Sequence, residues 1–229
     1  MCTSFVFKGN DVIVGFNFDN EPTADIKIKS KDGFVYGVYR FKDRFSASFG
    51  VNRDGGFSNQ LTVPPSEKGS YLRSTSVQRI DLLAEDYLNS KISFEQAVDI
   101  ASKRPLVNVP GLSVHSQLSD RYGRVLILEP GRGYKVREEK YSVMTNFSFF
   151  EPMATKDASG SGYDRYITAS RILQNATEVF GPMDGMKLLE QCRQTGSFVT
   201  LVSMVYSVRE NKVYWCLRGD YEKLLYKQF

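Results

Sequence analysis

The chain has 229 residues, of which 41% are hydrophobic, 13% aromatic and 24% charged, a composition typical of an ordered globular protein with an aromatic-rich core. Its formal net charge of +4 comes from 30 basic and 26 acidic residues scattered along the chain, and this distribution argues against a nucleic-acid partner. No apolar run approaches the roughly 18 residues that span a bilayer, and the N-terminus lacks the pattern of a signal peptide. We therefore expect a single domain over residues 1–229, cytoplasmic and without membrane insertion.

The first residues predict a β-hairpin. Phe5 and Phe7 fall on one face of a strand, and Gly9-Asn10-Asp11 supplies a turn before a second apolar run. Further strand-like runs follow, and Pro64-Pro65 closes this part of the chain; the runs are Asp25–Lys29, Gly33–Arg40, Phe45–Val51 and a segment ending at Val63.

The hydrophobic period changes at Ser76, where apolar residues take the spacing of one helical face. Ser93-Phe94-Glu95-Gln96 then forms the pattern of a capping box and predicts the start of a second helix. The elements expected after this helix pair are strands at Leu112–Leu118, Arg124–Glu129, Gly133–Arg137 and Tyr141–Met144, helices near Tyr163–Ala176 and Met183–Gln194, and strands at Ser197–Val208, Lys212–Arg218 and Glu222–Tyr226.

This order of elements lacks the β-α-β alternation of a parallel sheet. It predicts an α+β fold in which two stacked antiparallel sheets are flanked by helix layers. An ordinary α+β sandwich is the alternative.

The cysteines are Cys2, Cys192 and Cys216, an odd number without metal-ligand spacing, so we expect reduced thiols and no metal site. Cys192 and Cys216 have apolar neighbours and are expected in the core. Cys2 directly follows Met1, and removal of Met1 would leave a thiol and a free α-amino group on one residue.

Such a terminus supplies a nucleophile and a general base without a histidine. An α-amine has a pKa of about 7.7–8.0 and a thiol one of about 8.5, so the amine can accept the thiol proton. A Cys–His dyad would require His115, the single histidine of the chain. We expect His115 instead to be a core or packing residue on a strand.

Several segments along nearly the whole chain match motifs of one family. They are Met1-Cys2-Thr3-Ser4, Gly15-Phe16-Asn17-Phe18-Asp19, Gly50-Val51-Asn52-Arg53-Asp54-Gly55, Ser119-Asp120-Arg121-Tyr122-Gly123, Val143-Met144-Thr145-Asn146 and Tyr163-Asp164-Arg165-Tyr166. Together they resemble the choloylglycine hydrolase and penicillin V acylase family of N-terminal-nucleophile (Ntn) hydrolases, with its acyltransferase and acid-ceramidase relatives. The resemblance implies a four-layer αββα sandwich, the Ntn-hydrolase fold.

The resemblance also implies the activity and the residues that perform it. The expected reaction is hydrolysis of the linear amide bond of an N-acylated small molecule through a Cys2 thioester, without a cofactor. Asp19 would orient the N-terminus, Asn146 would donate to the oxyanion, and Arg165 would approach the nucleophile. A backbone N–H near Thr62 is the expected second oxyanion donor.

Four apolar residues close to these motifs are candidates for substrate binding, with the hydrophobic core as the alternative for the phenylalanines after Asn146. The candidates are Phe57, Leu61, Phe147 and Phe149.

Two features depart from the family pattern. The hydrolase branch commonly carries Arg where this chain has Phe16, so bile-salt hydrolysis is less expected. The loop between Asn146 and Arg165 is also shorter than in the bile-salt enzymes, where an insertion helps to build a tetramer. A homo-oligomer remains compatible with the sequence, but that tetramer is not expected. The alternative functions are an acyltransferase with the same intermediate and a non-catalytic binding protein, for which Phe16 is the hint.

Overall fold

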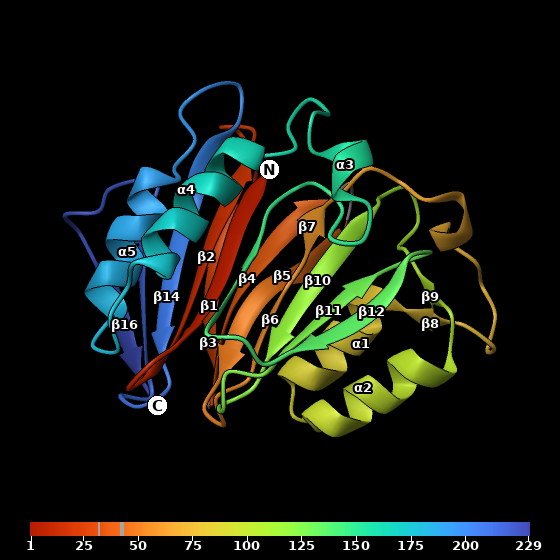
Figure 1. Cartoon of the computed structure of the whole chain (residues 1–229), viewed down its shortest axis with the longest axis horizontal. Helices are drawn as coiled ribbons and strands as arrows, with labels where there is room; N and C mark the ends of the chain where they lie inside the picture. The colour runs from red at the N-terminus through yellow and green to blue at the C-terminus, as the bar shows by residue number, and fades with distance from the viewer. Residues whose placement is uncertain (32, 42–43) are drawn as a thin grey trace.

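The computed structural model describes residues 1–31, 33–41 and 44–229. Within these residues, two large antiparallel sheets lie face to face between two pairs of helices (Figure 1). The predicted α+β fold with stacked antiparallel sheets is therefore confirmed.

The first sheet contains the N-terminal hairpin at its centre. Its strands, in spatial order, are β13 (Tyr141–Met144), β1 (Cys2–Lys8), β2 (Val12–Asn20), β14 (Val199–Ser207), β15 (Lys212–Leu217) and β16 (Leu225–Gln228). The β1–β2 hairpin has the predicted turn and pairs Cys2 with Phe18 across the ladder.

The second sheet carries the middle of the chain. Its strands, in spatial order, are β12 (Gly133–Arg137), β11 (Val125–Glu129), β10 (Val114–Ser119), β6 (Phe57–Asn59), β5 (Arg44–Asn52), β4 (Phe34–Phe41) and β3 (Ile26–Lys31), with β7 (Leu61–Thr62) also pairing with β10. A short parallel pair joins β8 (Gln78–Arg79) to β9 (Leu106–Val107).

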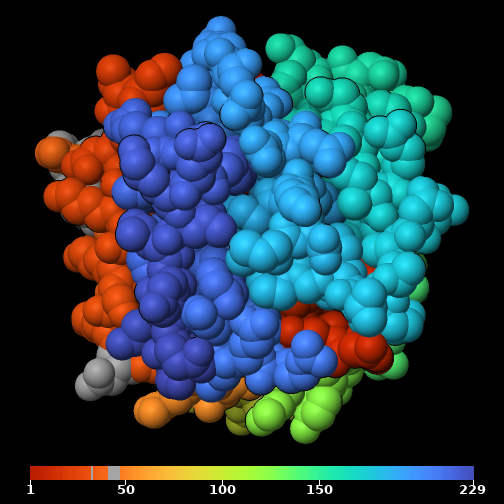
Figure 2. All heavy atoms as spheres, turned by 90° about the vertical axis from the view of Figure 1, so that its left-hand side faces the viewer, coloured from red at the N-terminus to blue at the C-terminus, as the bar shows by residue number. Residues whose placement is uncertain are grey.

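The outer faces of the two sheets are covered by the helices α1 (Ile80–Leu88), α2 (Phe94–Lys103), α4 (Tyr163–Gln174) and α5 (Pro182–Gln191). The short helix α3 (Pro152–Thr155) and the 3₁₀ turn η1 (Glu67–Gly69) lie in connecting segments. Helices α4 and α5 lie on the first sheet, and α1 and α2 lie on the second. Figure 2 shows the side of the molecule on which the C-terminal part of the chain covers most of the N-terminal hairpin.

Two local predictions have different outcomes in the helical region. The capping box is confirmed, because Ser93 Oγ accepts the Gln96 N–H and Gln96 Oε1 accepts the Ser93 N–H. The helical start at Ser76 is wrong: α1 begins at Ile80. Gln78 is extended because its N–H donates to the Pro105 carbonyl 2.9 Å away, beside the parallel pair.

The layer between the sheets is rich in aromatic residues, as the composition predicts. Phe16 is fully buried there and packs on Phe49 and Phe57 of the second sheet, with ring centroids 4.8 and 6.5 Å away. On the other face of the hairpin, Phe5 lies directly opposite Gly15. A Cβ atom at Gly15 would lie 2.0 Å from the Phe5 ring, so the sheet requires glycine at this position.

We expect Gly15→Ala to destabilise the fold by about 2–3 kcal/mol, because overpacking a close core contact forces the ring and backbone to move. Chemical denaturation with matched m-values measures the change in unfolding free energy. Gly196→Ala is the control, since a Cβ atom there meets nothing within 4 Å. Equal stability of the two variants would contradict this account of Gly15.

Candidate active site

Cys2 is the first residue of β1 and its side chain is buried. Met1 precedes it in this structure, and the Met1 α-ammonium donates to the Asp19 carbonyl at 2.8 Å. The Cys2 backbone N–H donates to Asn146 Oδ1 at 2.6 Å. The atom that becomes the α-amino nitrogen after removal of Met1 therefore already has a defined partner.

Asp19 lies near the end of β2, beside the N-terminus. Its Oδ1 accepts the Thr200 hydroxyl at 2.6 Å, and its Oδ2 lies 3.5 Å from Arg165 Nη1. Burial raises the pKa of Asp19 to about 6, although Thr200, Arg165 and the terminal ammonium each favour the charged carboxylate.

Arg165 is in the first turn of α4, and its side chain is buried. Its Nη1 donates to the Cys2 carbonyl at 2.5 Å and to Thr3 Oγ1 at 2.8 Å, and its Nη2 lies 3.2 Å from Asn146 Oδ1. Gly162 caps this helix with a φ of 69°, and a Cβ atom there would lie 2.1 Å from Arg165 Nη2. Glycine therefore leaves the space that the guanidinium needs.

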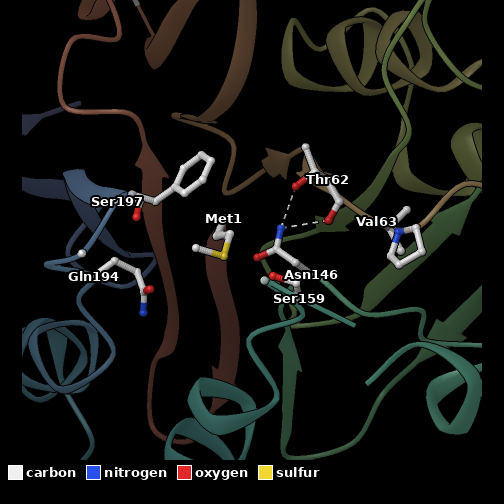
Figure 3. Close-up of a pocket in the computed structure, with 11 residues that line it drawn as sticks. Met1, Thr62, Val63, Asn146, Ser159, Gln194 and Ser197 are labelled. Carbon is white, nitrogen blue, oxygen red and sulfur yellow. Dashed lines mark hydrogen bonds between the residues drawn. The ribbon is translucent and has the colours of Figure 1, made fainter. Parts of the chain in front are cut away.

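Asn146 follows the end of β13. Its Oδ1 receives the bonds from Cys2 and Arg165, so its amide nitrogen faces the other way. That nitrogen donates to the Thr62 carbonyl at 2.8 Å and to Thr62 Oγ1 at 3.0 Å (Figure 3). The structure thus brings Thr62 to the site, while the oxyanion role of a backbone N–H at this position stays a prediction.

The Cys2 thiol lies among opposing electrostatic effects. Burial raises its pKa, the Met1 ammonium lowers it, the Asp19 carboxylate raises it, and Arg165 lowers it; the net shift is upward. A thiol in this setting is mainly protonated with Met1 in place. Removal of Met1 would place the ammonium on Cys2 itself, and a closer positive charge favours the thiolate.

A pocket of about 510 Å³ opens beside these residues. Thr62, Val63 and Asn146 line one side, Gln194 and Ser197 line another, and the Met1 side chain lies between them (Figure 3). The methionine therefore occupies space next to Cys2 that a substrate would need.

The four predicted substrate-binding residues do not line this pocket. Phe57 and Leu61 are fully buried in the layer between the sheets. Phe147 packs edge-on against Tyr163 and Tyr166, and Phe149 packs against Phe150. The structure gives them packing contacts, and their role in binding stays an untested prediction.

The residues that sequence reasoning missed belong to the segment after α5. Gln194, Ser197 and Phe198 line the pocket, and Thr200 binds Asp19. They reach the site because β14 pairs with β2, with Thr200 opposite Asp19. No local motif in the sequence indicates this pairing.

Other predictions concern the rest of the chain. Cys192 and Cys216 are buried free thiols, as expected, and His115 is fully buried on β10, as expected. Within the described ranges, no group of three or more His, Cys, Asp or Glu side chains is arranged to hold a metal ion. In the same ranges, no helix has the length and apolar character needed to cross a membrane.

The buried Asp19 carboxyl predicts a pH dependence of stability in protein that retains Met1. Its pKa is higher in the folded chain than in the unfolded one, so its contribution is full below about pH 4 and is lost as the pH rises through about 6. Relative to Asp19→Asn, the unfolding free energy should fall by about 3 kcal/mol over this range. Urea denaturation at several pH values measures the difference, with the exposed Asp157→Asn as control. A constant difference between wild type and Asp19→Asn would contradict the buried carboxyl assignment.

Comparison with known proteins identifies similar folds. No protein-family model matches the sequence, and no curated protein matches it. A mutant of conjugated bile acid hydrolase from Clostridium perfringens superposes with a TM-score of 0.71 and 13% identity, covering 100% of this chain and 92% of that one. Penicillin V acylase from Agrobacterium tumefaciens superposes with a TM-score of 0.66 and 19% identity, covering 94% of this chain and 83% of that one. A Caenorhabditis elegans N-acylethanolamine-hydrolyzing acid amidase ortholog superposes with a TM-score of 0.61 and 17% identity, covering 90% of this chain and 92% of that one. The chain therefore has the fold of these amide hydrolases, as the resemblance in its motifs predicts.

Proposed function

We propose that the chain, after removal of Met1, hydrolyses the linear amide bond of an uncharged N-acylated small molecule through a Cys2 thioester. One observation carries the proposal: Cys2, Asp19, Asn146 and Arg165 come from distant segments and converge on the chain terminus beside a pocket. Amide-hydrolysing enzymes with the same fold support it.

In the first half-reaction the Cys2 thiol passes its proton to the α-amino group of the same residue. The sulfur then forms a bond with the amide carbonyl carbon, and the carbonyl oxygen becomes an oxyanion. One Asn146 amide N–H, exchanging its contact with the Thr62 hydroxyl for the oxyanion, stabilises this charge together with a backbone N–H near Thr62. The C–N bond breaks, and the α-ammonium gives its proton to the leaving amine.

In the second half-reaction water attacks the thioester carbonyl and loses a proton to the α-amino group. The C–S bond breaks, the acid leaves, and the thiol recovers its proton. Asp19 and Arg165 keep opposite charges beside the terminus throughout. A carboxylate and a cation therefore both lie beside the amine while it acts as base and then as acid.

The pocket lining supports an uncharged substrate. Val63, Pro64 and Phe198 offer apolar surface, while Gln194 and Ser197 offer neutral polar groups. Phe16, at the position where the hydrolase branch commonly has Arg, is buried between the sheets and brings no cation to the pocket. A short or medium apolar acyl chain fits these surroundings better than an anionic one.

Cys2→Ala should lower the activity on such amides by a factor on the order of 10³ or more, because no other group forms the thioester. Turnover of a panel of N-acyl amides measures the loss, and unfolding curves check that the variant folds. The matched control is Cys216→Ala, another buried free thiol. Full activity in Cys2→Ala would refute the proposal, and formation of a new amide with an added amine would favour acyl transfer over hydrolysis.

Retention of Met1 should abolish turnover. The Cys2 nitrogen is then an amide that donates to Asn146 and has no basic lone pair, and the Met1 side chain lies in the pocket between its two walls. Chromatographic fractions of the protein, assigned by intact mass as with or without Met1, are compared for activity. We expect activity to follow only the fraction that lacks Met1; equal activity in both fractions would exclude the α-amine as the base.

A further inference from the structure

Beneath the candidate site lies a buried network of ionisable residues that the proposed chemistry does not use. It consists of His115 on β10, Glu129 at the end of β11 and Arg132 in the turn that follows. The side chains of His115 and Glu129 are 0% exposed, and that of Arg132 is 7% exposed. A buried charged group is costly unless it is paired, so each of these side chains needs partners. The partners identify the parts of the chain that the network holds in place.

The network contacts the backbone on both sides of Asn146. His115 Nε2 lies 2.7 Å from the Thr145 carbonyl oxygen. A carbonyl oxygen only accepts hydrogen bonds, so Nε2 carries a proton and donates it. Three residues beyond Asn146, the Phe149 N–H donates to Glu129 Oε2 at 3.0 Å. The segment that carries Asn146 is thus tied to the second sheet at two points.

The three side chains are also linked to one another. His115 Nδ1 lies 3.7 Å from Glu129 Oε2, and Arg132 Nη1 lies 3.1 Å from Glu129 Oε1. Burial alone would raise the pKa of Glu129, but His115, Ser148 and the Phe149 N–H hold it below its usual value. Glu129 is therefore a carboxylate that faces both the imidazole and the guanidinium.

Arg132 extends the network to the wall of the pocket. Its Nη1 donates to the Pro64 carbonyl at 2.9 Å, and its Nη2 lies 3.5 Å from the Pro65 carbonyl. Pro64 lines the pocket next to Thr62 and Val63. One network therefore anchors both the Asn146 segment and the segment that follows Thr62.

We infer that His115 is a positioning residue: with Glu129 and Arg132 it fixes the backbone from which the two oxyanion-stabilising groups project. The inference rests on the proposed function, since it assigns the network a role through Asn146 and Thr62. A displacement of about 1 Å in a catalytic group can cost about 10²-fold in rate, so loss of the His115 contact should be visible in kcat.

His115→Leu places an apolar side chain in the core and removes the N–H donor to the Thr145 carbonyl. We expect kcat on the amide to fall by about 10- to 100-fold with little change in KM, because the oxyanion exists only in the transition state. His115→Gln offers an N–H to Thr145 and should recover part of the loss. The matched control is Gln117→Leu on the same strand: Gln117 is fully buried, and its side-chain nitrogen and oxygen have no hydrogen-bond partner among the described residues. Equal losses in His115→Leu and Gln117→Leu would overturn the inference.

A second measurement does not depend on activity. Because the chain has a single histidine, its ¹⁵N imidazole signals are unambiguous, and Nε2 should be protonated. Amide hydrogen exchange at Asn146 and Phe149 should accelerate in His115→Leu but not in Gln117→Leu. If the wild-type protein lacking Met1 has no amidase activity, the proposed function fails, and these signals alone decide whether His115 holds the segment.

Arg132→Met covers the case in which His115→Leu does not fold. It removes the contacts with Glu129, Pro64 and Pro65 from a side chain that reaches the surface at Glu151. We expect faster exchange at Val63 and Phe149 and a fall in kcat of about tenfold. Unchanged exchange and an unprotonated Nε2 in the wild type would overturn the inference.

Discussion

The candidate site depends on the burial of one guanidinium, that of Arg165. A buried cation is tolerated only where acceptors replace the water that it loses. Arg165 finds these acceptors in the Cys2 carbonyl, the Thr3 hydroxyl, the Asp19 carboxylate and the Asn146 amide oxygen. The contacts that satisfy its charge therefore also bring β1, β2 and the end of β13 to one point, with α4 as the support.

Asp19 shows the limits of this compensation. Its contact with Arg165 is long, at 3.5 Å, and the better hydrogen bond to the carboxylate comes from Thr200. Burial consequently dominates and raises its pKa. Because Thr200 lies on β14, the electrostatics at the terminus also depend on a strand from the last part of the chain.

Local patterns in the sequence predict the elements well where a local interaction determines them. The N-terminal hairpin follows from period-two apolar residues and a turn at Gly9-Asn10-Asp11, and the start of α2 follows from the Ser93 capping box. The predicted start of the first helix at Ser76 is wrong because a long-range strand pairing, between Gln78 and Leu106, competes with helix formation there. The helix propensity of a segment carries no information about a distant strand that pairs with it.

The candidate catalytic residues could be predicted from the sequence, but most of the pocket lining could not. Chemistry alone pointed to Cys2, while Asp19, Asn146 and Arg165 required the resemblance to a family, and the structure places them together. The pocket was not predictable in the same way. Phe147, close to Asn146 in sequence, makes ring contacts with Tyr163 and Tyr166 outside the pocket lining, whereas Gln194 and Ser197 reach the pocket through strand pairing between distant segments.

The position of β1 between β13 and β2 has a consequence for the order in which the sheet can form. β1 ends at Lys8, but its sheet is complete only after β14, β15 and β16, about 200 residues further along the chain, have been made. At the usual elongation rate of about 5–20 residues per second this delay is roughly 10 to 40 seconds. For most of that time the pocket around Met1 lacks the wall formed by Gln194, Ser197 and Phe198. The order of the strands thus places the synthesis of the Met1–Cys2 peptide well before the pocket that encloses it can form.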